Sequence, residues 1–207
     1  MNDSTFDYII VGAGTAGCLL ANRLSADASK RVLLIEAGKR DDYHWIHIPV
    51  GYLYCIGNPR TDWLYQTEPT EGLNGRALRY PRGKVLGGCS SINGMIYMRG
   101  QSRDYDQWAT ITDDPQWRWD QCLPYFQFHE DHHKGASETH GARGVAAALL
   151  NPQSHPDAAS AEYFRILKAR QAGGEWRIEK QRLSWGVLDA FAQAAQQAGV
   201  PASSDFN

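Results

Sequence analysis

An α/β fold built on a parallel sheet is predicted by three features near the start of this 207-residue sequence. The apolar run Phe6–Val11 has the length and β-branched content of a buried strand. A glycine-rich turn, Gly12–Gly17, follows directly, and a second run, Arg31–Ile35, ends at the acid Glu36. Because a helix between two such strands forms the βαβ unit of a parallel sheet, we expect this unit here.

The turn has the spacing Gly-x-Gly-x-x-Gly, which is typical of a turn that binds a diphosphate. Gly12 permits a tight turn, Gly14 lets backbone N–H groups approach a pyrophosphate, and Gly17 lets the next helix pack closely on the strand. The phosphates would lie at the positive N-terminal end of that helix. A glycine turn without a phosphate is the alternative, and the order strand, turn, helix, strand and acid argues against it.

The acid at the end of the second strand bears on the type of cofactor. Glu36 lies 24 positions after Gly12, where a carboxylate is expected to accept hydrogen bonds from ribose hydroxyls. Its negative charge would repel a 2′-phosphate, which disfavours NADP. The pattern does not separate NAD from FAD.

A second glycine-rich block lies between Tyr80 and Gly100. Its glycines permit close approach of the backbone to a ligand, and its small polar side chains offer donors and acceptors. Such a loop suits a flat ring with polar edges, and a mobile surface loop is the alternative interpretation. The residues concerned are Gly83, Gly87, Gly88, Ser90, Ser91, Asn93, Gly94 and Gly100.

The two blocks and the segments between them resemble the N-terminal part of the glucose–methanol–choline (GMC) flavoprotein oxidoreductases, choline dehydrogenase-like branch. Phe6–Glu36 resembles the ADP-binding βαβ unit of that family, and Pro81–Gly94 resembles its first signature. Asp62–Pro69 also matches a family segment. The resemblance implies an α/β, FAD/NAD(P)-binding Rossmann-like domain of the GMC type, followed by the start of a substrate domain.

The resemblance also implies FAD as cofactor and a set of residues that hold it. Some family members attach the flavin covalently through a histidine at the position of Ile92. Isoleucine has no nucleophilic atom, so we expect non-covalent binding. The candidate cofactor-binding residues are Gly12, Gly14, Thr15, Ala16, Gly17, Glu36, Ala37, Arg82, Val85, Gly88, Ser90, Asn93, Gly94 and Met95.

The activity that the resemblance implies is oxidation of a CH–OH donor, an alcohol or a choline-like molecule, with hydride passing from the alcohol carbon to flavin N5. The family takes the hydroxyl proton with a C-terminal histidine, and none of the seven histidines here occupies that position. We therefore assign no catalytic residue. The alternative is a catalytically silent nucleotide-binding chain. A NAD-linked Rossmann enzyme is a third interpretation, which the Arg82–Gly94 block argues against.

The domain organisation predicted from the sequence is incomplete. Only two parallel-type strands occur before residue 40, and a parallel sheet needs more strands covered on both faces. Residues 1–140 are assigned to the FAD-binding GMC region, 141–172 to an insertion of unknown structure, and 173–207 to a resumed GMC region that ends before the catalytic part. Helices are expected from Ser102, from Asp120 and over Val187–Ala198, with their apolar stripes in the core.

Composition excludes several other functions. The net charge of −2 gives no basic surface for nucleic acid, and no run of 18 apolar residues could cross a membrane. No secretory signal is recognised, so the cytoplasm is expected. The histidines of His129–His133 lack the spacing of a closed metal site, and we expect a solvated, charged helix end there and no metal.

Overall fold

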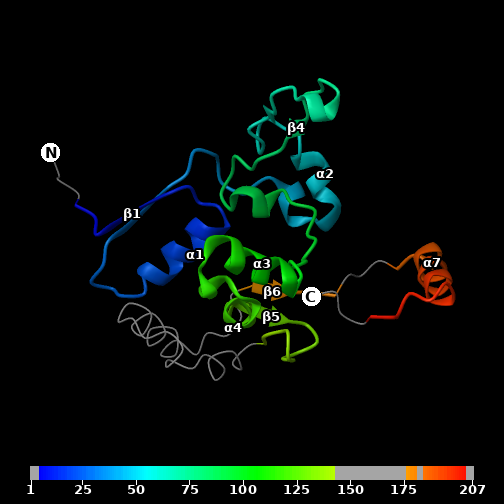
Figure 1. The fold of residues 1–207 in the computed structure, drawn as a ribbon. Coiled ribbons are helices and arrows are strands. Elements are labelled where there is room, and N and C mark those ends of the chain that lie inside the picture. Colours follow the sequence, from blue (N-terminus) through cyan, green and yellow to red (C-terminus); the bar gives the residue numbers. More distant parts are fainter. Residues whose placement is uncertain (1–4, 143–175, 181–183, 204–207) are drawn as a thin grey trace. The chain divides into compact units, whose positions relative to one another are not determined.

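The computed structural model confirms the predicted βαβ order. Strands β1 (Tyr8–Val11) and β2 (Val32–Ile35) run parallel, and helix α1 (Thr15–Leu24) connects them (Figure 1). Tyr8 pairs with Val32 in the register of this sheet. The structure describes residues 5–142, 176–180 and 184–203, and these divide into two units at Ile96 and Tyr97.

The glycines of the first turn have the steric roles that their spacing predicts. Gly12 has φ +94°, in the left-handed region that favours glycine, and so turns the chain sharply out of β1. A Cβ atom on Gly17 would overlap the carbonyl oxygen of Gly12 and would lie 3.4 Å from the side chain of Ile10. Helix α1 therefore approaches β1 as closely as it does because residue 17 has no side chain.

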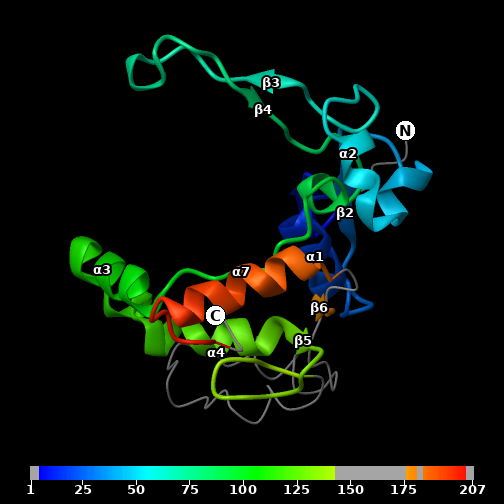
Figure 2. The ribbon, with the colours of Figure 1, turned by 90° about the vertical axis from the view of Figure 1, so that its right-hand side faces the viewer.

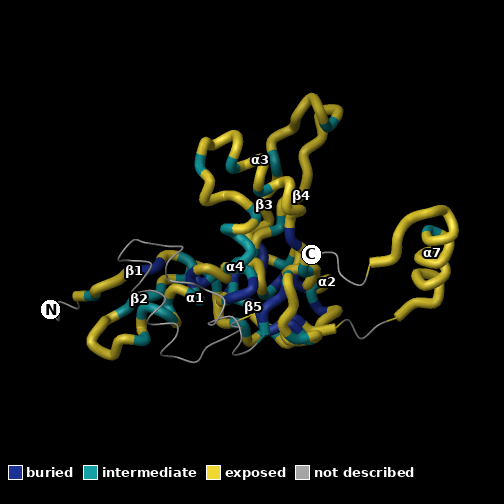
Figure 3. Tube along the Cα trace, turned by 60° about the horizontal axis from the view of Figure 1, so that its bottom comes forward, coloured by how far each residue is buried: buried dark blue, intermediate teal, exposed yellow. Residues whose placement is uncertain are grey.

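The prediction that both strands are buried is wrong for the described residues. Ile10 faces α1 and is buried, but Ile9 and Val11 on the other face are 61% and 83% exposed (Figure 3). In the part of the chain that the structure describes, this sheet has two strands, and α1 covers one of its faces. Alternate side chains of a strand point to opposite faces, so a single helical layer buries only every second residue.

The rest of the first unit consists of short helices and an antiparallel hairpin. Its core is the cluster of Cys55, Val85 and Ile92, against which Tyr43 and Trp45 pack. Strands β3 and β4 form an arm that extends away from α2 (Figure 2). The elements are η1 (His44–His47), η2 (Pro49–Gly51), α2 (Tyr52–Cys55), β3 (Tyr65–Gln66), η3 (Glu71–Leu73), β4 (Arg79–Tyr80) and η4 (Gly88–Ser91).

The second unit is built around two helices and a short parallel pair of strands. The ring of Tyr105 on α3 contacts the rings of Trp119 and Phe126 on α4, which joins the two helices. Strand β5 pairs with β6, which lies more than 40 residues later in the sequence. The elements are α3 (Ser102–Thr112), η5 (Pro115–Trp117), α4 (Trp119–His129), β5 (Glu130–His132), β6 (Trp176–Ile178) and α7 (Gly186–Gln197).

The predicted helices exist, but the backbone N–H groups at the N-termini of α3 and α4 are bound by other residues than the sequence predicted. At α3 the N-cap is Gln101, whose N–H donates to the Asp104 carboxylate at 2.8 Å. At α4 the N-cap is Arg118, and the N–H of Trp119 donates to Asp106 of α3 at 3.0 Å. A capping box of Gln101 and Asp104 at α3, and the Asp106 carboxylate at α4, thus stand in place of the caps expected from Ser102 and Asp120.

Helix α7 ends as predicted, but its apolar stripe does not lie in a core. Gly199 has φ +91° and follows the helix, as expected of a glycine that ends one. Leu188 and Phe191 are 58% and 73% exposed in the described structure, so the assignment of this stripe to the core is wrong. The predicted segment 141–172 lies, apart from its first two residues, outside the described residues, and its boundaries stay predictions.

Candidate functional site

The N-terminus of α1 forms a cradle of backbone N–H groups. Gly14 is the N-cap, it has an extended conformation, and within the described residues no side chain caps the helix. The first amide to bond within this helix is that of Cys18, which donates to Gly14 O at 2.9 Å. The N–H groups of Thr15, Ala16 and Gly17 therefore point out of the helix start, where a diphosphate can accept them.

The space in front of this cradle suits the phosphates. A Cβ atom on Gly14 would meet no atom of the described structure within 4 Å. The first turn of α1 contains no acidic residue that would repel an anion. The residues present therefore fit the diphosphate of a dinucleotide.

Glu36 lies beside the cradle and is held by the main chain. One carboxylate oxygen accepts the N–H of Ala13 at 2.7 Å, and the other accepts the N–H of Gly38 at 2.8 Å. Each oxygen keeps a second lone pair that can accept a hydroxyl proton. Glu36 and the adjacent Ala37 are thus placed at the end of β2 next to the glycine turn, and their contact with a ribose stays a prediction.

The structure brings the second glycine block directly against the first. Gly87 N donates to Ala13 O at 2.7 Å. A Cβ atom on Gly88 would lie 2.8 Å from the Cα of Gly14, so the two backbones touch. Sequence reasoning missed Ala13, whose C=O accepts the N–H of Gly87 and so joins the blocks, while its N–H donates to Glu36. The residue between the two glycines carries no side-chain signal.

Val85 is placed in the core rather than on an open surface. Its side chain is almost fully buried with Cys55 and Ile92, so it can offer a ligand only main-chain groups. Val85 also forms an isolated parallel β-bridge with Lys39, and Leu86 N donates to Lys39 O at 2.9 Å. The segment before Gly87 is therefore fixed to the loop that follows β2.

The polar residues of the block are held by their neighbours in sequence. Ser90 Oγ donates to Gly87 O at 2.7 Å, and Asn93 Oδ1 accepts the N–H of Met95 at 3.0 Å. The Arg82 guanidinium donates to Pro81 O at 2.7 Å and lies over the ring of Tyr80. These contacts leave the flavin-side roles of Arg82, Ser90 and Asn93 as predictions.

Gly94 and Met95 lie in an open part of the block. A Cβ atom on Gly94 would meet no described atom within 4 Å. Met95 has φ +59°, which is uncommon for a residue with a side chain, and it is exposed. Their flavin-side roles also stay predictions.

The second unit contains a buried charged cluster where the sequence predicted a solvated helix end. Glu130 is 1% exposed and accepts hydrogen bonds from Tyr97 and Arg99. Tyr97 and Arg99 bind the Oε1 atom of this carboxylate. The Oε2 atom accepts the N–H of Gly141 at 3.0 Å and lies 3.0 Å from His140 Nδ1. The prediction for His129–His133 is therefore wrong, because α4 ends at His129 and the following residues form the buried strand β5.

This cluster gives Glu130 a stable negative charge. Burial alone would raise the pKa of Glu130, but the hydrogen bonds from Tyr97, Arg99, His140 and Gly141 outweigh burial and hold the pKa below 4.5. Burial and the hydrogen bond to Glu130 raise the pKa of Tyr97 to about 12.

Within the described residues, no group of three or more His, Cys, Asp or Glu side chains could hold a metal ion.

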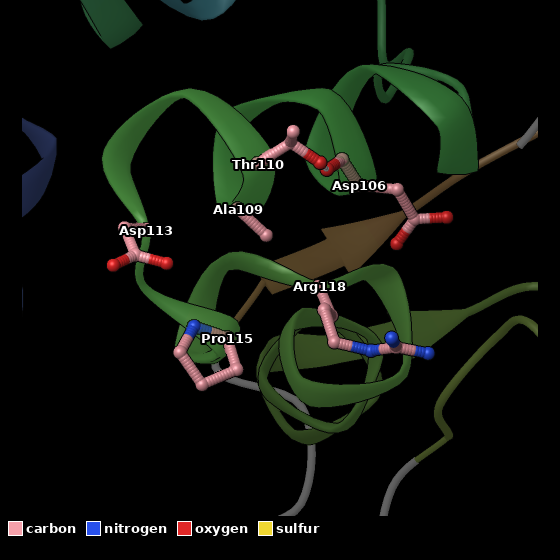
Figure 4. A pocket seen from close by; sticks show the side chains of 6 residues that line it. All are labelled: Asp106, Ala109, Thr110, Asp113, Pro115 and Arg118. Carbon is pink, nitrogen blue, oxygen red and sulfur yellow. Dashed lines mark hydrogen bonds between the residues drawn. The ribbon is translucent and has the colours of Figure 1, made fainter.

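A pocket of about 370 Å³ lies in the second unit, and none of the predicted cofactor residues lines it (Figure 4). Two of its charged groups have partners: Asp106 accepts the N–H of Trp119, and Arg118 pairs with Asp120 at 3.2 Å. We assign no ligand to it. It is lined by Asp106, Ala109, Thr110, Asp113, Pro115 and Arg118.

The βαβ unit, its open cradle and the abutting glycine block define a dinucleotide-binding protein. Residues 6–207 match the family model described as GMC oxidoreductase, and the chain belongs to this family. It is therefore the α/β, FAD-binding N-terminal portion of a GMC oxidoreductase, and the family binds FAD. The resemblance inferred from the sequence is confirmed.

Similar proteins include dehydrogenases and an oxidase. An oxygen-dependent choline dehydrogenase of Photobacterium profundum is 37% identical over 99% of this chain and 31% of that protein. An alcohol dehydrogenase (acceptor) of Pseudomonas putida is 47% identical over 72% of this chain and 28% of that protein. The crystal structure of pyridoxine 4-oxidase from Mesorbium loti superimposes with a TM-score of 0.74 at 34% identity, covering 95% of this chain and 33% of that one.

The chain thus spans about a third of the length of the relatives that it matches. Among the described helices, none has the length and apolarity needed to cross a membrane.

The buried cluster predicts a pH-dependent loss of stability. A carboxylate whose pKa is lowered in the folded state contributes stability above about 4.5, its unfolded value, and this contribution disappears as the pH falls through the folded pKa. Glu130→Gln removes the negative charge that faces the buried Arg99 guanidinium, and we expect it to lower the free energy of unfolding by about 3 kcal/mol at pH 7. The difference should shrink below pH 4.5, as measured by urea unfolding.

The matched control is Glu138→Gln, at an exposed acid in the loop that follows β5. It should change the urea midpoint little at either pH. Equal effects of the two substitutions would contradict the role assigned to Glu130.

Proposed function

We propose that this chain is the FAD-binding portion of an oxidoreductase that acts on CH–OH donors, with a small alcohol of the choline type as substrate. The observation that carries the proposal is the contact between the two glycine blocks, where Gly87 N donates to Ala13 O beside the open cradle at Gly14. One elongated cofactor can then touch both blocks. The dehydrogenases and oxidases among the similar proteins support the reaction class.

The chain's own residues bind and orient the cofactor. The N–H groups at the start of α1 would hold the diphosphate, and Glu36 would accept the ribose hydroxyls. The main chain around Gly88 would face the flavin side. When bound, FAD supplies N5 as the acceptor of the hydride that leaves the alcohol carbon.

The alternative is a catalytically silent FAD- or nucleotide-binding chain. It is supported by the absence, in the sequence, of a histidine that matches the family's catalytic position, and by the share of its relatives that the chain spans. The two proposals agree on binding and differ on whether the bound FAD takes part in alcohol oxidation once a catalytic histidine is supplied.

Non-covalent binding predicts complete release of flavin by acid. Ile92 stands where some members carry the histidine that attaches the cofactor, and its side chain is packed in the Cys55 and Val85 core. Precipitation of the FAD-loaded chain with trichloroacetic acid should leave all flavin absorbance in the supernatant. Yellow colour that stays in the washed pellet would contradict non-covalent binding.

Gly14→Val should abolish FAD binding without unfolding the chain. The new side chain finds no described atom within 4 Å of its Cβ, so it would occupy the space of the diphosphate rather than disturb the packing. Flavin fluorescence titration measures the affinity, and circular dichroism measures the fold. Gly72→Val is the control, since Gly72 also has open space but lies in the β3–β4 arm. If Gly14→Val bound FAD with the affinity of the wild-type chain, the cradle would not be part of the FAD site.

The FAD-loaded 207-residue chain should give no alcohol-dependent reduction of a dye. No side chain here is assigned to take the proton of the alcohol hydroxyl. Without that deprotonation the alcohol carbon is a poor hydride donor. Dichlorophenolindophenol absorbance with choline, and with a primary aliphatic alcohol, measures the rate. Turnover above that of free FAD would place a catalytic base in this chain and exclude the silent alternative.

A further inference from the structure

Asp62 is a buried carboxylate that lies outside both glycine blocks. It is 3% exposed and accepts three backbone N–H groups: Gly57 at 2.8 Å, Leu64 at 3.0 Å and Arg82 at 3.1 Å. Burial would raise the pKa of Asp62, but these hydrogen bonds outweigh it and keep the pKa below its ordinary value. The group is therefore an anion near neutral pH whose partners are main-chain N–H groups.

These bonds close the base of the β3–β4 arm. Gly57 precedes the arm, Leu64 begins it and Arg82 ends it, so one carboxylate ties three separate points of the chain. Leu64 has φ +59°, a conformation that a residue with a side chain adopts only when its surroundings impose it. Asp62 also forms an antiparallel bridge with Gly83, which fixes Gly83 at the exit of the arm.

Gly83, at the start of the second glycine block, packs directly against Gly88 of the same block. A Cβ atom on Gly83 would overlap the carbonyl group of Gly88 and would lie 2.7 Å from Cys89 N. Gly88 is itself in contact with Gly14, because a Cβ on Gly88 would lie 2.8 Å from the Cα of Gly14. The path from Asp62 to the cradle thus consists of backbone contacts with no flexible side chain between them.

We propose that Asp62 is a positioning residue for the FAD site: its carboxylate fixes Arg82 and Gly83, and Gly83 holds Gly88 against the diphosphate cradle. The inference rests on the proposed function, since the cradle is the diphosphate site. It adds a residue that makes no contact with the cofactor itself and that sets the distance between the two glycine blocks.

The first test compares two Asp→Asn variants of the full 207-residue chain. Asp62→Asn keeps the size of the side chain but turns one acceptor oxygen into an NH₂ group that faces a backbone N–H. Flavin fluorescence titration should show FAD binding weakened by about tenfold or more, as expected when hydrogen bonds to a charged group are lost. Asp42→Asn is the control, because Asp42 is exposed and pairs only with Arg60 among the contacts described. Equal affinities of the two variants would overturn the proposal.

A second readout needs no cofactor. Hydrogen exchange of the FAD-free chain, read by mass spectrometry over residues 82–88, should be faster in Asp62→Asn than in Asp42→Asn. Unchanged exchange there would show that Asp62 does not hold this segment. If the wild-type chain binds no FAD, the proposed function fails, and this measurement still decides whether Asp62 fixes the block.

Gly83→Ala tests the second half of the path with Asp62 intact. Its methyl group would push against Gly88, so FAD binding should weaken by about tenfold or more, whereas Gly72→Ala, in open space within the arm, should bind as the wild type does. If Asp62→Asn does not fold, this pair carries the test. Equal affinity of the two alanine variants would overturn the relay from Gly83 to the cradle.

Discussion

The close approach of two backbones, at Ala13–Gly14 and at Gly87–Gly88, is the constraint on which the candidate site depends. The amide of Gly87 donates to Ala13 O, and the Cα of Gly14 leaves room for no side chain at Gly88. A side chain at Gly88 would separate the start of α1 from the second block. The glycines here therefore serve two purposes: they let the main chain meet itself, and they leave the N–H groups of the cradle open to a ligand.

Local patterns in the sequence were sufficient for the elements that depend on neighbouring residues. Strand β1, the turn at Gly12, α1 and β2 follow from apolar runs, glycine spacing and a terminal acid within about 30 residues. Helix α7 ends where Gly199 predicts it. In each case the residues that determine the element lie in it or directly beside it in the sequence. The local sequence is therefore enough to predict the element.

The buried cluster of Glu130 could not be foreseen for a corresponding reason. Its partners Tyr97 and Arg99 come from about 30 residues earlier, and a charged residue next to histidines has no local pattern that separates a buried ion pair from a solvated helix end. Burial also depends on distant elements. Ile9 and Val11 have the composition of core residues, but their exposure is decided by what covers the second face of the sheet.

Two carboxylates, Glu36 and Asp62, belong to the segments around a site proposed for an anionic diphosphate. Their negative charges would repel the phosphates unless other groups offset them. Glu36 accepts the N–H groups of Ala13 and Gly38, and Asp62 accepts those of Gly57, Leu64 and Arg82. N–H dipoles that point at a buried carboxylate offset its charge locally, so the repulsion of a phosphate is reduced while the main chain is held rigid. Each acid thereby orders backbone that a neutral side chain could hold only through weaker hydrogen bonds. Neither acid belongs to the first turn of α1, whose N–H groups stay open to a ligand.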